Sequence, residues 1–199
     1  NLKELIKNAK GEWIVFMGDD DVFIPGALNK FILFLKEHNN LGYVLRAHDL
    51  IHEDGGIEKF RYYDETKFFE PGEKTFIELL RKSVFISGFT IKRELVLPYL
   101  TVNDFDEGAL FQIYLLGEVI LRHESAYFDE LLTREIAERD YRKNEQFFDR
   151  MKKKFVPRQI TLDVSISFLS GFSKITEFID KKYGIYSTVG MKKDMSKYF

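Results

Sequence analysis

The stretch GEWIVFMGDDDVFIPGAL, residues 11–28, sets an apolar run against three consecutive aspartates and a proline. Its first part, WIVFM, is a short, continuous run of β-branched and aromatic residues, which predicts a buried strand. Pro25 suits the first turn of a helix. Apolar residues then recur at helical spacing, at Leu28, Phe31, Ile32 and Leu35. The stretch therefore predicts a strand, an acidic turn and a helix in direct succession.

Strands and helices alternate along the rest of the chain up to about residue 140. We expect helices near 1–10, 73–83 and 110–117, and strands in GYVLRAHDLIH, IEKFRYY, VFISGFTIKRE and EVILRHESAYFDELLTREI. Such alternation is typical of an α/β sheet covered by helices. Ligands bind at the carboxyl ends of the strands in such sheets, and the aspartates follow a strand directly.

The composition excludes several classes of protein. With 45% hydrophobic residues among 199, the chain can bury a sizeable core. The absence of cysteine excludes disulfides, thiolate zinc sites and thiol catalysis, and agrees with a cytoplasmic location. A net charge of −2 gives no basic field for nucleic acid, so we expect no nucleic-acid partner.

Neither a membrane span nor a signal peptide is visible. No apolar run approaches the roughly 18–20 residues that cross a bilayer, and the N-terminus lacks the pattern of a secretion signal. The chain begins at Asn1 and not at methionine, so we expect it to be a piece of a longer protein.

Asp19, Asp20 and Asp21 carry the first candidate site. Successive side chains of an extended backbone alternate in direction, so two carboxylates can converge while the third turns toward the sheet or caps the next helix. Such hard oxygen ligands suit Mg²⁺ or Mn²⁺, which complete their shell with water and substrate phosphates. The alternative is an acidic turn that only caps the helix.

The longer segment NAKGEWIVFMGDDDVFIPGAL resembles the central motif of the inverting family 2 glycosyltransferases, which have the GT-A fold. The resemblance implies a GT-A-like mixed α/β sheet flanked by helices, and transfer of a sugar from a nucleoside-diphosphate donor to a glycan or lipid-linked acceptor. It makes Asp20 the metal ligand and Asp19 the donor contact. Asp21 becomes a helper in donor and metal binding, or a cap, and Asp19 with Asp21 also has the D-x-D spacing of the family.

Inverting transfer needs a base, and the resemblance points to Asp106-Glu107-Gly108-Ala109-Leu110. In the family an acid pair followed by leucine opens a helix and removes the proton from the acceptor hydroxyl. Either Glu107 or Asp106 would be that base here. The alternative is that both acids only favour a helix N-terminus.

Three further residues are candidates for the same site. Ser87 and Gly88 match a glycine-containing segment of the family that lines the acceptor site, although a bulge in a strand explains them equally well. His123 would complete the metal site, because some GT-A enzymes use a late histidine; its alternative is a structural role.

We place a boundary near residue 140, with a partial GT-A domain at 1–140 and a helical extension at 141–199. The partial domain lacks the first strands of the family's nucleotide pocket, so a non-catalytic carbohydrate- or partner-binding module is the rival interpretation. The extension carries RMKKKFVPR and MKKDMSKYF. It would either contact anionic lipid as a basic surface, or pack on the sheet or in a homodimer through apolar residues.

Overall fold

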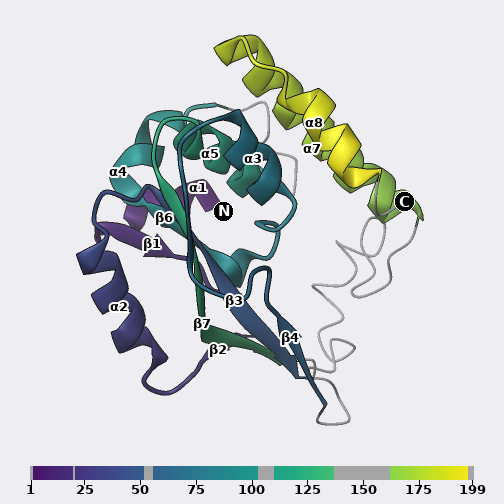
Figure 1. The fold of residues 1–199 in the computed structure, drawn as a ribbon. Helices are drawn as coiled ribbons and strands as arrows, with labels where there is room; N and C mark the ends of the chain where they lie inside the picture. The colour runs from purple at the N-terminus through teal and green to yellow at the C-terminus, as the bar shows by residue number, and fades with distance from the viewer. Residues whose placement is uncertain (1, 20, 52–55, 103–109, 137–161, 197–199) are drawn as a thin grey trace.

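The computed structural model describes residues 2–19, 21–51, 56–102, 110–136 and 162–196. Within them the chain forms one mixed sheet with helices on both faces (Figure 1). The strands are β1 Trp13–Val15, β2 Asp21–Phe23, β3 Tyr43–Ile51, β4 Ile57–Phe60, β5 Lys67–Phe69, β6 Phe89–Lys92 and β7 Ser125–Ile136. The helices are α1 Leu2–Asn8, α2 Ala27–Glu37, α3 Glu73–Leu80, α4 Arg93–Val96, α5 Phe111–Ile120, α7 Leu162–Tyr183 and α8 Ser187–Met195, with single 3-10 turns η1 Ile86–Gly88 and η2 Leu97–Tyr99.

The parallel pair β3 and β7 forms the centre of the sheet, in the order β1-β6-β3-β7-β2. Each of the two long strands is flanked by two short ones. On β3, β6 pairs with the first half and β4 with the second, both antiparallel. On β7, β5 pairs with the first half and β2 with the second, again antiparallel. Because β1 and β3 are both antiparallel to β6, β1 runs parallel to β3.

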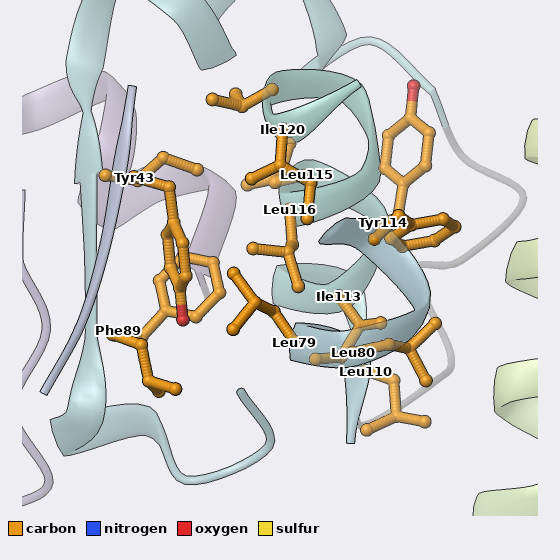
Figure 2. Close-up of a cluster of buried hydrophobic side chains, with 14 of the residues drawn as sticks. Tyr43, Leu79, Leu80, Phe89, Leu110, Ile113, Tyr114, Leu115, Leu116 and Ile120 are labelled. Atoms are coloured by element: carbon orange, nitrogen blue, oxygen red, sulfur yellow. The ribbon is translucent and has the colours of Figure 1, made fainter. Parts of the chain in front are cut away.

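Side chains of β3 alternate between two hydrophobic layers. Tyr43 and Leu45 enter the larger layer with α3 and α5, whereas Val44 enters the smaller layer with Phe31 and Phe34 of α2. Figure 2 shows the larger layer, in which Tyr43 and Phe89 of the sheet face leucines of α3 and α5.

Helix α5 is buried along its whole length, from Phe111 to Ile120. A helix that is buried all round needs neighbours on both sides. The sheet covers one side, and α7 covers the other with Phe172, Ile175 and Ile179, which belong to the same hydrophobic cluster. Helix α8 contacts α3 in the same way. The C-terminal helices therefore pack on the helical layer and share its core.

The expected mixed α/β fold class with C-terminal helices is confirmed, and four local predictions need correction. Residues 118–120, predicted to begin a strand, belong to helix α5, and the strand begins at Ser125. Asp21 is the first residue of β2 and does not cap a helix. Helix α2 begins at Ala27, after Gly26 in the left-handed region (φ 78°), so Pro25 precedes the helix. The Ser87-Gly88 pair forms the turn η1 before β6 and does not interrupt a strand.

Other predictions fall outside the described residues. These are the turn at 52–55, the domain boundary near 140 and the basic segment RMKKKFVPR at 150–158. Among the helices that are described, none combines the length and the apolar character needed to cross a membrane.

A buried carboxylate joins α7 to α5. Glu118 is fully buried, accepts a hydrogen bond from Lys182 Nζ at 2.6 Å, and accepts another from the hydroxyl of Tyr183. The guanidinium of Arg122 lies 3.7 Å from the same carboxylate. Two partly exposed cations therefore balance the buried negative charge. Arg122 lies just after α5, and Lys182 lies at the end of α7.

We expect Lys182→Met to lower the free energy of unfolding by about 1–3 kcal/mol, because it removes a charged hydrogen-bond donor from a buried carboxylate while Arg122 remains. Urea titration monitored by circular dichroism measures this change. The matched control is Lys181→Met at an exposed position of the same helix, which should change the value by less than about 0.5 kcal/mol. Equal effects of the two substitutions would contradict the role of the ion pair.

Candidate functional site

Asp19 and Asp21 lie at the carboxyl edge of the sheet. Strand β1 ends at Val15, and the chain then turns through Gly18 and Asp19 before Asp21 opens β2. Asp21 pairs with Glu135 near the end of β7, which runs parallel to β3. The carboxyl ends of β1, β3 and β7 therefore meet at one edge, as the sequence predicts for a ligand site.

A hydrogen bond between Asp21 and Gly18 marks the reversal of the chain that we call the aspartate turn. The backbone N–H of Asp21 donates to the carbonyl of Gly18 at 3.4 Å. Asp19 is exposed and Asp21 is half-buried. Asp20, the predicted metal ligand, lies outside the described residues.

Ser87 contacts both ends of this aspartate turn. Its hydroxyl accepts a hydrogen bond from the Gly18 N–H at 2.6 Å and donates one to Oδ2 of Asp21. Its carbonyl accepts a hydrogen bond from Thr133 Oγ1 at 3.2 Å. The structure thus brings Ser87 to the aspartates, and the side chain is fully buried there.

Gly88 allows the close approach of the turn η1 to β3. A Cβ atom at this position would lie 3.3 Å from the carbonyl oxygen of Arg46, which is backbone and cannot move aside cheaply. The absence of a Cβ atom therefore favours glycine here, because it lets η1 pack closely on the strand.

Arg46 lies fully buried beneath the aspartate turn. Its Nη2 donates to the carbonyl of Phe16 at 3.1 Å, and its guanidinium lies 5.5 Å from the ring centre of Phe31. Among the described residues, Nε and Nη1 have no hydrogen-bond partner. Burial lowers the pKa of Arg46 to about 9, and the nearby Tyr43 and Asp21 act in the opposite direction. Sequence reasoning missed this residue, although an arginine within the apolar run YVLRA was a visible signal.

His48 forms an aromatic stack next to this site. Its ring lies 3.9 Å from the ring centre of Phe85 and 4.8 Å from that of Phe60, at interplanar angles of 22° and 5°. Burial, followed by the positive charge of Arg46, lowers the pKa of His48 to about 4. The imidazole is therefore neutral at pH 7 and behaves as part of the aromatic packing.

The structure does not bring His123 to the aspartates. His123 precedes β7 and lies against Gly42 at the amino edge of the sheet. Asp21 pairs with Glu135, which lies opposite Leu50 of β3, eight residues beyond Gly42, and this span corresponds to about 26 Å along the strand. His123 and Asp21 therefore lie at opposite edges of the sheet. Asp106 and Glu107 lie outside the described residues.

The donor atoms of the aspartate turn suit a magnesium or manganese ion in part. Within the described part of the chain, no three histidine, cysteine, aspartate or glutamate side chains gather to hold a metal. Mg²⁺ however commonly binds through one or two carboxylates and takes the remaining ligands from water and phosphate. Asp19 is exposed at this edge, so its carboxylate is accessible from solvent.

Comparison with known proteins gives one family. Residues 1–95 match the model of the family described as glycosyl transferase family 2. This range contains β1 to β6, the aspartate turn, Arg46 and Ser87. No curated protein matches the chain.

We expect His48 to make the free energy of unfolding decrease in acid more steeply than it would without this histidine. Its pKa is about 4 in the folded state against an ordinary 6.5, so the unfolded state binds the proton more tightly. The stability it contributes is complete above pH 6.5 and is lost as the pH falls toward 4, by about 1–2 kcal/mol between pH 7 and pH 5.

Replacement of His48 by Phe should remove this part of the pH dependence, since a phenyl ring keeps the stack and binds no proton. Urea unfolding of both proteins at pH 8, 7, 6 and 5 measures the difference, and the other histidines contribute equally to both curves. If the two curves stay parallel over this range, the burial of a neutral imidazole is not the source of acid sensitivity.

Proposed function

We propose, from the premise that residues 1–95 belong to a family 2 glycosyltransferase domain, that the chain transfers a sugar from a nucleoside-diphosphate donor to a hydroxyl of a glycan or lipid-linked acceptor. The observation that carries the proposal is the aspartate turn at the carboxyl edge of the sheet, inside the matched range. The transfer would invert the configuration of the anomeric carbon, as in the family that the sequence resembles.

Asp20 and Asp19 are the residues that we assign to the donor. Asp20 would hold Mg²⁺ or Mn²⁺, and when bound this ion would neutralise the negative charge that grows on the leaving diphosphate. Asp19 is exposed next to it, so its carboxylate is free to accept hydrogen bonds from donor hydroxyls. Asp21 differs from both, because its carboxylate accepts the hydroxyl of Ser87.

Glu107 or Asp106 would act as the base. Its carboxylate would take the proton of the acceptor hydroxyl as that oxygen forms a bond to the anomeric carbon. The bond from the anomeric carbon to the diphosphate oxygen breaks at the same time, and the nucleoside diphosphate leaves with the electron pair. This assignment is supported by the acid pair in the sequence and by its place before α5.

Replacement of Asp20 by Ala in the full-length protein should lower the transfer rate by at least about a hundredfold, because it removes the carboxylate assigned to the metal. Release of nucleoside diphosphate from a panel of nucleotide sugars with Mn²⁺ measures the rate. Asp64→Ala, at an exposed loop position, is the matched control and should keep the normal rate. A normal transfer rate in the Asp20 variant would contradict the assignment of Asp20 as the metal ligand.

The base can be identified by isosteric substitution. Glu107→Gln or Asp106→Asn, whichever removes the base, should lower kcat by about a hundredfold or more with little change in donor affinity. Steady-state kinetics and equilibrium binding of the nucleotide sugar separate the two effects. Asp104→Asn is the control in the same segment. Near-normal kcat in both test variants would show that the base lies elsewhere.

A further inference from the structure

We propose that Ser87 and Asp21 form an internal clamp that sets the shape of the aspartate turn, and that Asp21 is a positioning residue rather than a metal ligand. The inference rests on the proposed function, because it concerns how Asp19 and Asp20 are presented to a cation. The sequence leaves Asp21 either as a helper in donor and metal binding or as a cap. In the structure the surroundings of Asp21 differ from those of the exposed Asp19.

A single hydroxyl joins the two ends of the turn. A serine hydroxyl has one donor and two acceptor sites. Here the acceptor side takes the N–H of Gly18, the first residue of the turn, at 2.6 Å. The donor side binds the carboxylate of Asp21, the last residue of the turn. The backbone bond from Asp21 to Gly18 is long, at 3.4 Å, so the serine bridge is the stronger restraint on the turn.

Hydrogen bonds from two neighbouring segments fix the backbone of Ser87. Ser87 lies within η1, where the N–H of Gly88 donates to the carbonyl of Phe85 at 3.1 Å. Thr133 of β7 holds the Ser87 carbonyl from the opposite direction at 3.2 Å. The hydroxyl is fully buried, so water does not compete for its two bonds. The turn η1 and strand β7 therefore fix the backbone of Ser87, and this backbone places the hydroxyl against Gly18 and Asp21.

Asp21 is turned inward by the same arrangement. It starts β2, pairs with Glu135 of β7, and directs Oδ2 to the buried hydroxyl. The buried guanidinium of Arg46 lies close enough for its charge and that of Asp21 to attract each other. The charge of Asp21 is thus balanced from within the protein. Asp19, by contrast, is exposed, and it is left with Asp20 to meet a cation from solvent.

The first test measures the turn itself and needs no ligand. Ser87→Ala removes the acceptor of the Gly18 N–H, so hydrogen exchange of this amide under native conditions should accelerate at least about tenfold. Ser83→Ala is the matched control: Ser83 is equally buried, and its hydroxyl binds Tyr43 and the Leu79 carbonyl away from the turn. This control should leave Gly18 exchange unchanged. Unchanged exchange in the Ser87 variant would overturn the clamp.

The second test uses Mn²⁺ alone, with free ion followed by electron paramagnetic resonance. Ser87→Ala should weaken Mn²⁺ binding about three- to tenfold, because a loosened turn presents its carboxylates less well. Asp21→Asn should stay within about threefold of the natural protein, since the amide oxygen still accepts the serine hydroxyl. Asp20→Asn should lose at least about tenfold. The double variant of Ser87 and Asp21 should be no weaker than Ser87→Ala, because the two residues act as one unit.

The two tests fail in different ways. If Asp21→Asn loses as much Mn²⁺ affinity as Asp20→Asn while Ser87→Ala keeps it, Asp21 is a ligand and the inference is wrong. If the natural protein binds no Mn²⁺, the metal assigned under the proposed function is wrong, and the exchange of Gly18 alone then decides whether the clamp exists.

Discussion

The parallel pairing of β3 with β7 is the constraint on which the rest of the structure depends. It runs from Tyr43 opposite Ser125 to Ile51 opposite Ile136, and it places the carboxyl ends of both strands at one edge. Its register shifts in the middle, where β3 advances from Arg46 to His48 while β7 advances from Phe128 to Thr133. Such bulges redirect side chains next to functional sites. Here the shift coincides with the point at which Arg46, His48 and Thr133 reach the site.

The arrangement at the carboxyl edge also reduces the electrostatic repulsion between the aspartates. Three adjacent carboxylates repel one another, and burial of any one of them without a partner is costly. The fold places the buried charge of Arg46 below the turn and a serine hydroxyl against Asp21, so the inward acid is compensated. Burial of Arg46 has its own cost, which its bond to the Phe16 carbonyl and its contact with Phe31 reduce. Asp19 of the same turn, by contrast, stays exposed to solvent.

Local patterns predicted the fold well because the forces involved are local. The run WIVFM and the spacing of Leu28, Phe31 and Leu35 follow directly from strand and helix periodicity. The bond between Ser87 and Asp21 could not be predicted in this way, because it joins positions 66 residues apart. For the same reason the sequence brought His123 into the metal site, since a motif does not tell at which edge of a sheet it will lie. The roles of Asp20, Asp106 and Glu107 stay predictions.

The site depends on parts of the chain beyond residues 1–95, where the family match ends. Thr133, which holds the carbonyl of Ser87, belongs to β7, and β7 is positioned by its pairing with β3. Helix α5 covers the sheet and is buried along its whole length, so it needs the cover that α7 provides through Phe172, Ile175 and Ile179. Residues of the first half of the chain thus form the site, and residues of the second half of the chain stabilise it by packing. The C-terminal helices therefore stabilise the helical layer that supports the sheet and, through the sheet, the site.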